Sequence, residues 1–541
     1  MLTAALLLSL QVSSPLAVVD DTIRAEQDII DYDITVFIPD RGESIRASAR
    51  IRYVLRGGFG PLILDFYEAL DVDSVLLNDS RVGSRGPDWD WEVIEGAEPD
   101  FLVLRQWSQV GDTLSVTVHY HGRPEDGLVI GKNVHGRRTA FADNWPNRAR
   151  HWFPGEDHPS DKATVSFTVA VPDGWSVVAN GLLVGVDSLE TGRTVWRWRE
   201  SRPIPVHTMV VGAGELAVAD LGEVNGVPQT SWTFPQDSAF AVEQPFRRAV
   251  QIVRVLDSVV GPFPYDKLAH VQSSTRYGGM ENSSAIFYAE AAYSSRHMSE
   301  GLVAHETAHQ WFGDAVSQYD WHHLWLSEGF ATYFGPLFFE VVGETDRFEE
   351  AMRSNKRRYM GSGVVDRPVI DTTVQDPFEL LNANNYQKGS WVLHMLRGEL
   401  GDSSFFAGIR EYYRVYRDST VLTSDLAEMM SRQAGRPMEW FFEQWLLQPG
   451  YPQLQVAWSY AESTGSLGVV IRQVQKQEWG EYSLRLPLEV ELENGEVVAK
   501  LIRVTGKESV HSIDVDGKPI AVKLDPDETL LMSVVDVRRG N

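Results

Sequence analysis

The amino-acid sequence predicts a multidomain α+β protein with an N-terminal antiparallel β domain, a mostly helical middle domain and a small C-terminal β-sandwich. The chain of 541 residues exceeds the usual size of one domain. The texture of the sequence changes twice, near residue 210 and near residue 450. Hydrophobic residues at 43% and charged residues at 23% are typical of a folded globular protein.

The N-terminal β domain is predicted over residues 24–210, where apolar and polar residues alternate in short runs. A period of two places every second side chain on the same face of a strand, so these runs indicate half-buried strands. Gly, Pro, Asn and Asp between the runs indicate turns. The runs include YDITVFIP, ASARIRYVLR, TLSVTVHYH, KATVSFTVAV and RTVWRWRE.

Helical spacing dominates the middle domain, which we place at residues 211–447. Apolar residues in FAVEQPFRRAVQIVRVLDSVVG recur at helical spacing, and the run stops at Gly261 and Pro262. GSWVLHMLRGEL and TSDLAEMMSRQAG continue the helical pattern. Beyond QPGYPQLQV, strands such as LQVAWSY and YSLRLPLEVELE return, so we expect a small β-sandwich over residues 451–541.

The composition excludes some classes of partner and of chemistry. With 49 Lys and Arg against 75 Asp and Glu, the formal net charge is −26, and we predict no nucleic-acid partner. The chain has no cysteine, which excludes disulfides, thiolate catalysis and cysteine-bound metals. Any metal must therefore be held by histidines and carboxylates. The sequence does not indicate an oligomeric state.

The N-terminus, residues 1–17, resembles a signal peptide. An apolar run from Leu2 to Leu10 is followed by small residues up to Ala17, although no Lys or Arg precedes Arg24. We expect an exported protein, periplasmic or secreted, and a cytoplasmic one if this is an ordinary apolar segment. No other stretch is long and apolar enough to span a bilayer, so no membrane span is predicted.

The stretch HETAH, residues 305–309, carries two histidines four positions apart. On a helix, residues i and i+4 share a face, so His305 and His309 can direct their imidazoles at one metal ion. Zinc accepts two such nitrogens and a third protein ligand while one position stays open. Glu328 starts a second apolar helical run and is the expected third ligand, because the polar segment between the runs can reverse the chain.

Glu306 lies one residue from a ligand, which places its carboxylate beside the open metal position. A carboxylate there can take a proton from zinc-bound water and pass it to a leaving amine. His322 and His323 also follow closely, but adjacent residues point in different directions, so we interpret them as packing or surface residues. The combination of HExxH with Glu328 predicts a catalytic site with one Zn²⁺ ion per chain.

Several motifs together resemble the zinc aminopeptidases of the aminopeptidase N type, a gluzincin family that also includes the leukotriene-hydrolysing enzyme. HETAH, eighteen residues and then a glutamate are similar to the family's zinc signature. YGGMEN at 277–282, NYQKGS at 385–390 and RARHWFPGEDHPSDKATVSF at 148–167 are similar to further family motifs, in family order. The resemblance implies a thermolysin-like catalytic domain and peptide substrates with a free N-terminus.

The resemblance also implies roles for individual residues. The family uses the glutamate of the second motif, here Glu281, to hold the α-ammonium of the substrate, which limits cleavage to the N-terminal residue. The backbone of Gly278 and Gly279 can approach an extended substrate closely. Tyr386 corresponds to the family's tyrosine that stabilises the developing oxyanion. The expected substrate-binding residues of this motif are Gly278, Gly279, Met280, Glu281 and Asn282.

The sequence departs from the family at three places. Where the family has Gln or Glu before an Ala-Arg pair to help bind the amino terminus, this chain has Trp145, with Asp143 two residues earlier. Either Asp143 substitutes, or Glu281 and Glu328 hold the amine alone while Trp145 shapes the wall of the first subsite. Ser327 stands where the family usually has Asn, so support of the metal ligands is expected to differ. Many relatives also have a large helical C-terminal domain, and without it we expect a more open cleft.

The leading hypothesis is a zinc-dependent aminopeptidase, in which zinc-bound water activated by Glu306 hydrolyses the first peptide bond of a substrate anchored by Glu281. A non-catalytic relative that serves as a binding scaffold is one alternative, but such relatives usually lose the base or a metal ligand. A zinc hydrolase acting on epoxides or on internal peptide bonds is the other, and the GGMEN motif disfavours purely internal cleavage.

Overall fold

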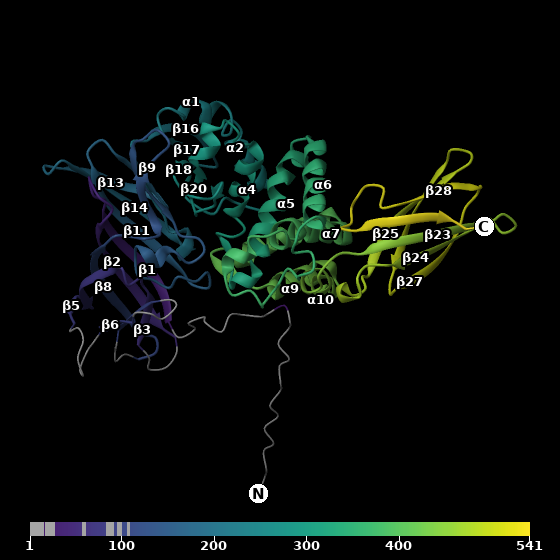
Figure 1. The fold of residues 1–541 in the computed structure, drawn as a ribbon, viewed down its shortest axis with the longest axis horizontal. Helices are drawn as coiled ribbons and strands as arrows, with labels where there is room; N and C mark the ends of the chain where they lie inside the picture. The colour runs from purple at the N-terminus through teal and green to yellow at the C-terminus, as the bar shows by residue number, and fades with distance from the viewer. Residues whose placement is uncertain are drawn as a thin grey trace, which may run out of the picture.

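The structure is a computed structural model that describes residues 16, 27–56, 61–82, 91–94, 100–104 and 109–540. The predicted signal peptide lies outside these residues apart from Leu16, so export stays a prediction. Among the described residues, no helix is long and apolar enough to cross a membrane. Figure 1 shows an N-terminal β-rich region, a central helical region and a C-terminal β-rich region in sequence along the molecule, which confirms the predicted α+β fold class.

The N-terminal region is built on an eight-stranded sheet with antiparallel neighbours except for one parallel pair, β1 and β11. The alternation in sequence corresponds to burial, because Tyr32, Ile34 and Val36 of β1 are fully buried while the residues between them are exposed. In spatial order the strands are β13 (Leu182–Leu189), β14 (Arg193–Pro205), β11 (Lys162–Pro172), β1 (Gln27–Phe37), β2 (Ile45–Leu55), β8 (Thr113–Gly122), β4 (Leu70–Leu77) and β5 (Ser80–Arg81).

Two smaller sheets complete this region. In one of them, strand β10 ends at Asp143. The segment after this strand carries Trp145, and the short helix η2 (Ala149–His151) begins six residues after Asp143. The first small sheet has the order β12 (Ser176–Ala179), β15 (Val211–Gly214), β10 (Arg138–Asp143) and β9 (Gly127–Lys132), and the second has β3 (Leu62–Asp65), β7 (Phe101–Leu104) and β6 (Trp91–Ile94).

The central region opens with a mixed five-stranded sheet that the helical pattern did not predict. Its inner strands, LAHVQS and AIFYA, are buried at every position and pair in parallel, so they show no alternation. The sheet ends at the edge strand that contains Gly279 and Met280. The order is β16 (Ala217–Val224), β17 (Val227–Thr233), β18 (Leu268–Ser273), β20 (Ala285–Ala289) and β19 (Gly279–Met280).

Helices follow the sheet, and Figure 1 shows α4, α5, α6 and α7 gathered in the middle of the molecule. The predicted run before Gly261 forms two helices that are interrupted around Pro245, whereas GSWVLHMLRGEL becomes α7 in full. The helices are α1 (Ser238–Glu243), α2 (Ala249–Val259), α3 (Glu290–Ser294), α4 (Glu300–His309), α5 (Trp325–Val341), α6 (Thr345–Met360), α7 (Gly389–Leu400), α8 (Asp402–Tyr416), α9 (Thr423–Ala434) and α10 (Glu439–Phe442), and β21 (Val316–Gln318) pairs with β22 (Ser419–Val421).

One close helix contact determines the geometry around the expected third ligand. Gly329, the residue after Glu328 on α5, lies against Gly389 at the start of α7, and a Cβ at position 329 would stand only 2.9 Å from the Cα of Gly389. The absence of side chains at both positions lets the π-helical turn η6 (Asn384–Lys388) pack against α5. Tyr386 is thereby held beside Glu328.

The C-terminal region contains seven described strands in two sheets. Buried and partly exposed residues alternate along the inner strands, as predicted for a β-rich domain with a core between its sheets. It contacts the central helices, where Lys356 Nζ donates to the Leu530 carbonyl at 2.9 Å. The sheets have the orders β27 (Glu508–Asp514), β24 (Ser466–Gln473), β23 (Gln453–Ala461), β29 (Ser533–Arg539) and β26 (Val497–Val504), β25 (Leu484–Leu492), β28 (Pro519–Leu524).

Candidate functional site

Two neighbouring helices bring the three predicted metal ligands together. His305 and His309 lie one turn apart on α4, with their Nε2 atoms 3.2 Å apart. Glu328 lies in the first turn of α5, and its Oε2 is 3.5 Å from the Nε2 of His305 and 3.3 Å from that of His309. Three donor atoms from two helices are therefore directed at one point.

The donor set fits a metal ion. Oε2 of Glu328 is buried and has no hydrogen-bond partner among the described residues, so a cation between the three donor atoms would satisfy it. Nδ1 of His309 lies 3.1 Å from the Phe312 carbonyl and 3.0 Å from Ser327 Oγ, which leaves Nε2 free for coordination. Ser327 therefore contacts a candidate ligand directly at the position where the sequence departs from the family.

Two further carboxylates adjoin this group. Glu281, Glu306 and His309 also offer side-chain atoms within 4.8 Å of one another, and all three side chains are buried. Burial raises the pKa of Glu306 well above its usual value, and the Glu281 and Glu328 carboxylates raise it further, against the lowering influence of His309. Burial likewise raises the pKa of Glu281.

Glu306 is held against the backbone of the GGMEN motif. A Cβ atom at position 279 would overlap with the carboxylate of Glu306, so an alanine on β19 at this point requires the end of that side chain to shift. At Gly278, by contrast, a Cβ would meet no atom within 4 Å. The two adjacent glycines therefore differ, because only Gly279 lies directly against the Glu306 carboxylate.

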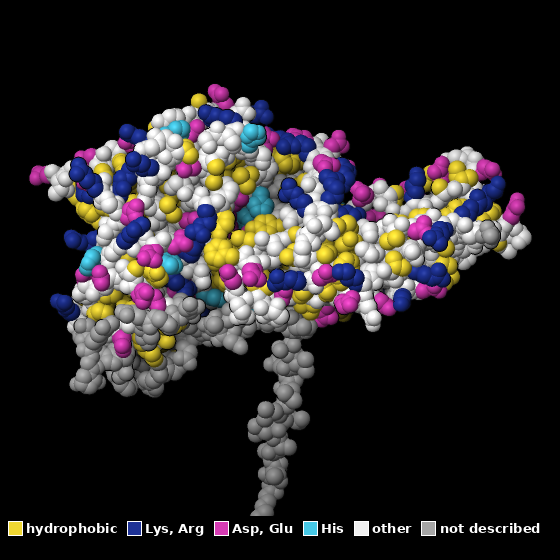
Figure 2. All heavy atoms as spheres, viewed as in Figure 1, with side chains coloured by type: hydrophobic (Ala, Val, Ile, Leu, Met, Phe, Trp, Pro, Cys, Tyr) yellow, Lys and Arg dark blue, Asp and Glu magenta, His cyan; other side chains and the backbone are white. Residues whose placement is uncertain are grey.

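These groups open into a cleft of about 500 Å³. Figure 2 shows a hollow between the N-terminal region and the helices, with histidine at its floor and hydrophobic side chains along it. Ten of the residues predicted for the site line the cleft: Trp145, Gly278, Gly279, Met280, Glu281, His305, Glu306, His309, Glu328 and Tyr386.

Tyr386 faces the candidate metal ligands from the π-helical turn η6. Its ring stacks on that of His305, with centroids 6.3 Å apart and planes inclined by 9°. Burial raises the pKa of the Tyr386 phenol well above its usual value and the charge of Glu328 adds to this, so the hydroxyl stays protonated and can donate a hydrogen bond. Single-turn π-helices often occur at functional sites.

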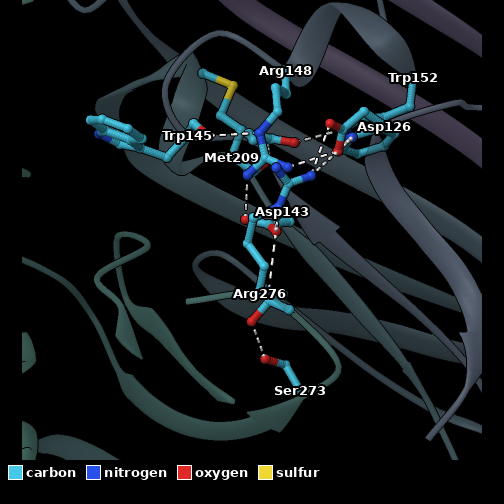
Figure 3. A network of polar contacts seen from close by, with 11 residues as sticks. Asp126, Asp143, Trp145, Arg148, Trp152, Met209, Ser273 and Arg276 are labelled. Carbon is cyan, nitrogen blue, oxygen red and sulfur yellow. Dashed lines mark hydrogen bonds and ion pairs between the residues drawn. The ribbon is translucent and has the colours of Figure 1, made fainter. Parts of the chain in front are cut away.

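Asp143 does not reach the cleft. Its carboxylate is 1% exposed and accepts a hydrogen bond of 2.7 Å from Arg148, while Arg276 Nε lies 3.6 Å away. Asp126 joins the same two arginines, at 2.7 and 3.0 Å, so four alternating charges form one network (Figure 3). Because Arg148 and Arg276 already neutralise Asp143, its position in this buried network does not support a role in binding the substrate amine.

Trp145 lies on the cleft side of this network. Nε of Arg148 donates to the Trp145 carbonyl at 2.7 Å, which ties the backbone of Trp145 to the charged network (Figure 3). The indole makes edge contacts with Tyr277, Trp321 and Phe378 at centroid distances of 6.2, 5.3 and 5.6 Å. It therefore forms a rigid aromatic wall.

Other predicted residues lie away from the cleft. Asn282 is fully buried, and neither polar atom of its side chain has a partner among the described residues. Nδ1 of His322 lies 2.8 Å from the Asp320 carboxylate, and His323 contacts Thr423 Oγ1 at 2.8 Å, so both are packing residues. Seven lining residues were not singled out from the sequence; Tyr277 and Gln387 belong to the YGGMEN and NYQKGS motifs, whereas no motif marks Leu302, Thr332, Asn355, Arg358 and Leu381.

Comparison with known proteins gives consistent matches. Residues 30–207 match the Peptidase M1 N-terminal domain, and residues 248–445 match the Peptidase family M1 domain. Similar curated proteins include the Tricorn protease-interacting factor F2 of Thermoplasma acidophilum, 25% identical over 72% of this chain and 50% of that protein. Leucyl aminopeptidase of Saccharolobus solfataricus is 27% identical over 71% of this chain and 48% of that protein. Aminopeptidase M1-A of Oryza sativa is 28% identical over 68% and 44%. The chain thus spans about half the length of these curated relatives.

Proposed function

The chain belongs to peptidase family M1, and we propose that it is a zinc-dependent aminopeptidase that removes the N-terminal residue from peptides. One observation carries the proposal. His305, His309 and Glu328 converge beside two further buried carboxylates, Glu306 and Glu281, in a single cleft. A metal centre with both a proton acceptor and an amine anchor is what cleavage at a free N-terminus requires.

His305, His309 and Glu328 would hold one zinc ion through two imidazole nitrogens and a carboxylate oxygen. Zinc bound there would supply Lewis acidity for hydrolysis of the peptide carbonyl. Ser327 and the Phe312 carbonyl both contact Nδ1 of His309 and so fix the orientation of that imidazole.

Glu306 acts as the general base and then as the general acid. It accepts a proton from the water molecule whose oxygen attacks the carbonyl carbon of the first peptide bond. As the C–N bond breaks, Glu306 passes this proton to the nitrogen of the departing peptide. Its burial among other carboxylates favours uptake of the proton. The phenol of Tyr386 donates a hydrogen bond to the carbonyl oxygen as negative charge develops there.

Glu281 determines which end of the peptide is cut. Its carboxylate lies close to Glu306 and His309 and is only 6% exposed, so it can pair with the α-ammonium of a substrate in a desolvated environment. The strand that contains Gly279 and Met280 is at the edge of its sheet and has a free backbone edge for an extended peptide. Trp145 forms an aromatic wall of the cleft and can contact the side chain of the first residue of the peptide.

The proposal is tested with aminoacyl-arylamides and their N-acetylated forms, each with and without removal of the metal by a chelator. We expect hydrolysis of the free-amine substrates only, loss of activity on chelation, and recovery on addition of zinc. Equal cleavage of the acetylated substrates would refute the amine anchor. Full activity after complete removal of the metal would refute the metal-dependent mechanism.

Replacement of Gly279 by Ala tests the contact between the motif and the base. Because the new methyl group overlaps with the Glu306 carboxylate, the end of that side chain must shift, and we expect kcat/KM to fall by up to about tenfold. Gly278→Ala is the matched comparison, since its methyl group would meet no atom within 4 Å, and its kcat/KM should stay within about twofold of the wild-type value. Equal losses in the two variants would show that Gly279 does not position Glu306.

A further inference from the structure

Helix α6 contributes Asn355 and Arg358 to the wall of the cleft. Arg358 makes no ion pair or hydrogen bond with any residue that the structure describes. It is exposed, in contrast to the buried carboxylates of the cleft. The other basic residues of this helix are paired: Arg347 with Glu344 at 2.7 Å, Arg353 with Glu350 at 3.3 Å, Lys356 with the Leu530 carbonyl at 2.9 Å and Arg357 with Glu350 at 2.7 Å.

The charges that line the cleft are distributed unequally. Glu281, Glu306 and Glu328 supply three carboxylates near the metal ligands, whereas Arg358 is the one Lys or Arg among the described lining residues. In Figure 2, Lys and Arg side chains gather on the rim of the hollow that α6 forms, while histidine lies at its floor. In a chain of net charge −26, an arginine that faces a substrate cleft without a carboxylate partner is available to a ligand.

We propose that Arg358 binds a substrate carboxylate on the far side of the scissile bond and that the protein therefore prefers short, free-acid peptides or peptides with an early acidic residue. This inference rests on the proposed function. Glu281 and Arg358 both line the cleft, so a peptide held at its ammonium by Glu281 can extend toward Arg358, whose planar guanidinium donates hydrogen bonds to both oxygens of a carboxylate.

The distance between the two anchors limits the length of the peptide. Each residue of an extended peptide spans about 3.3–3.6 Å, so only the first few residues lie inside a cleft of about 500 Å³. A terminal carboxylate reaches Arg358 only in a peptide of a particular short length. In longer peptides, only an Asp or Glu side chain at that place could make the same contact.

The test compares substrates that differ by one charge, using the full-length, zinc-loaded protein. The first comparison uses di-, tri- and tetrapeptides, each as a free acid and as a C-terminal amide. The second comparison uses two peptide amides that differ only in having Glu or Gln after the scissile bond. In at least one of the two comparisons, we expect kcat/KM to be about three- to tenfold higher for the substrate that carries the carboxylate. This advantage should shrink as salt is added.

Arg358→Gln should abolish this preference, and Arg358→Lys should retain part of it because the charge remains. Arg357→Gln is the matched control, since it removes a cation from the adjacent position of α6 whose partner is Glu350. The proposal is overturned if the preference is absent in the wild-type protein, persists in Arg358→Gln, or falls equally in Arg357→Gln. Hydrolysis of an aminoacyl-arylamide that has a free α-amine but no carboxylate separates these results from failure of the proposed function, in which no substrate is cleaved.

Discussion

Glu306→Gln is expected to lower kcat by about a thousandfold, the largest effect of any change considered. Gln has nearly the same size as Glu, so it fits against Gly279 as the native side chain does, but it cannot accept the proton of the attacking water. The loss therefore measures proton transfer alone. Steady-state hydrolysis of a leucyl-arylamide over a wide range of enzyme concentrations provides the measurement.

Two readouts separate this loss from damage to the site. The zinc content of Glu306→Gln should equal that of the wild-type protein, because His305, His309 and Glu328 are unchanged. Glu300→Gln is a matched control, since it neutralises a carboxylate on the same helix outside the cleft and should keep nearly full activity. A kcat of Glu306→Gln within tenfold of wild type would exclude Glu306 as the general base.

The second large effect is expected for Glu281→Gln, which should lower kcat/KM for free-amine substrates by about 100-fold. The α-ammonium of the substrate is desolvated when it binds beside this buried carboxylate, and a neutral amide cannot compensate for that cost. The measurement is the ratio of kcat/KM for aminoacyl-arylamides to that for their N-acetylated forms. That ratio should approach one as Glu281 loses its charge.

The fold around position 281 should survive the change. Gln310 donates to the backbone carbonyl of Glu281 at 2.7 Å, and this contact does not involve the carboxylate. Glu290→Gln is the control for loss of one negative charge in the same segment, because its carboxylate accepts from the Val134 amide outside the cleft. Retention of the full ratio in Glu281→Gln would assign the amine anchor to another group.

Much of the fold could be predicted because its signals are local. GSWVLHMLRGEL forms α7 over its whole length, and TSDLAEMMSRQAG forms α9 up to its glycine, since long periodic runs determine a helix without help from distant residues. The strands β1 and β2 likewise alternate as predicted. The central strands β18 and β20 were missed, because strands buried on both faces have no polar positions to reveal a period.

The same division holds for the candidate site. The convergence of His305 and His309 was predictable because residues four apart on a helix share a face. The position of Glu306 beside them follows from the same helix geometry. The role of Asp143 stayed open because its neighbours in sequence could not reveal Arg276, which is 133 residues away and approaches the same carboxylate. Trp145, two residues further, lines the cleft instead.

The sequence by itself determined the succession of β, helical and β regions, the pair of histidines with Glu306, and the presence of a second glutamate at Glu328. Only the tertiary structure decided that Gly279 lies against Glu306, that Gly329 and Gly389 bring Tyr386 to the candidate metal ligands, and that Arg358 faces the cleft without an ion pair to any residue that the structure describes. Local features follow from the residue periods of the helix and the strand. These contacts, by contrast, join segments far apart in the chain and exist only once the elements have packed.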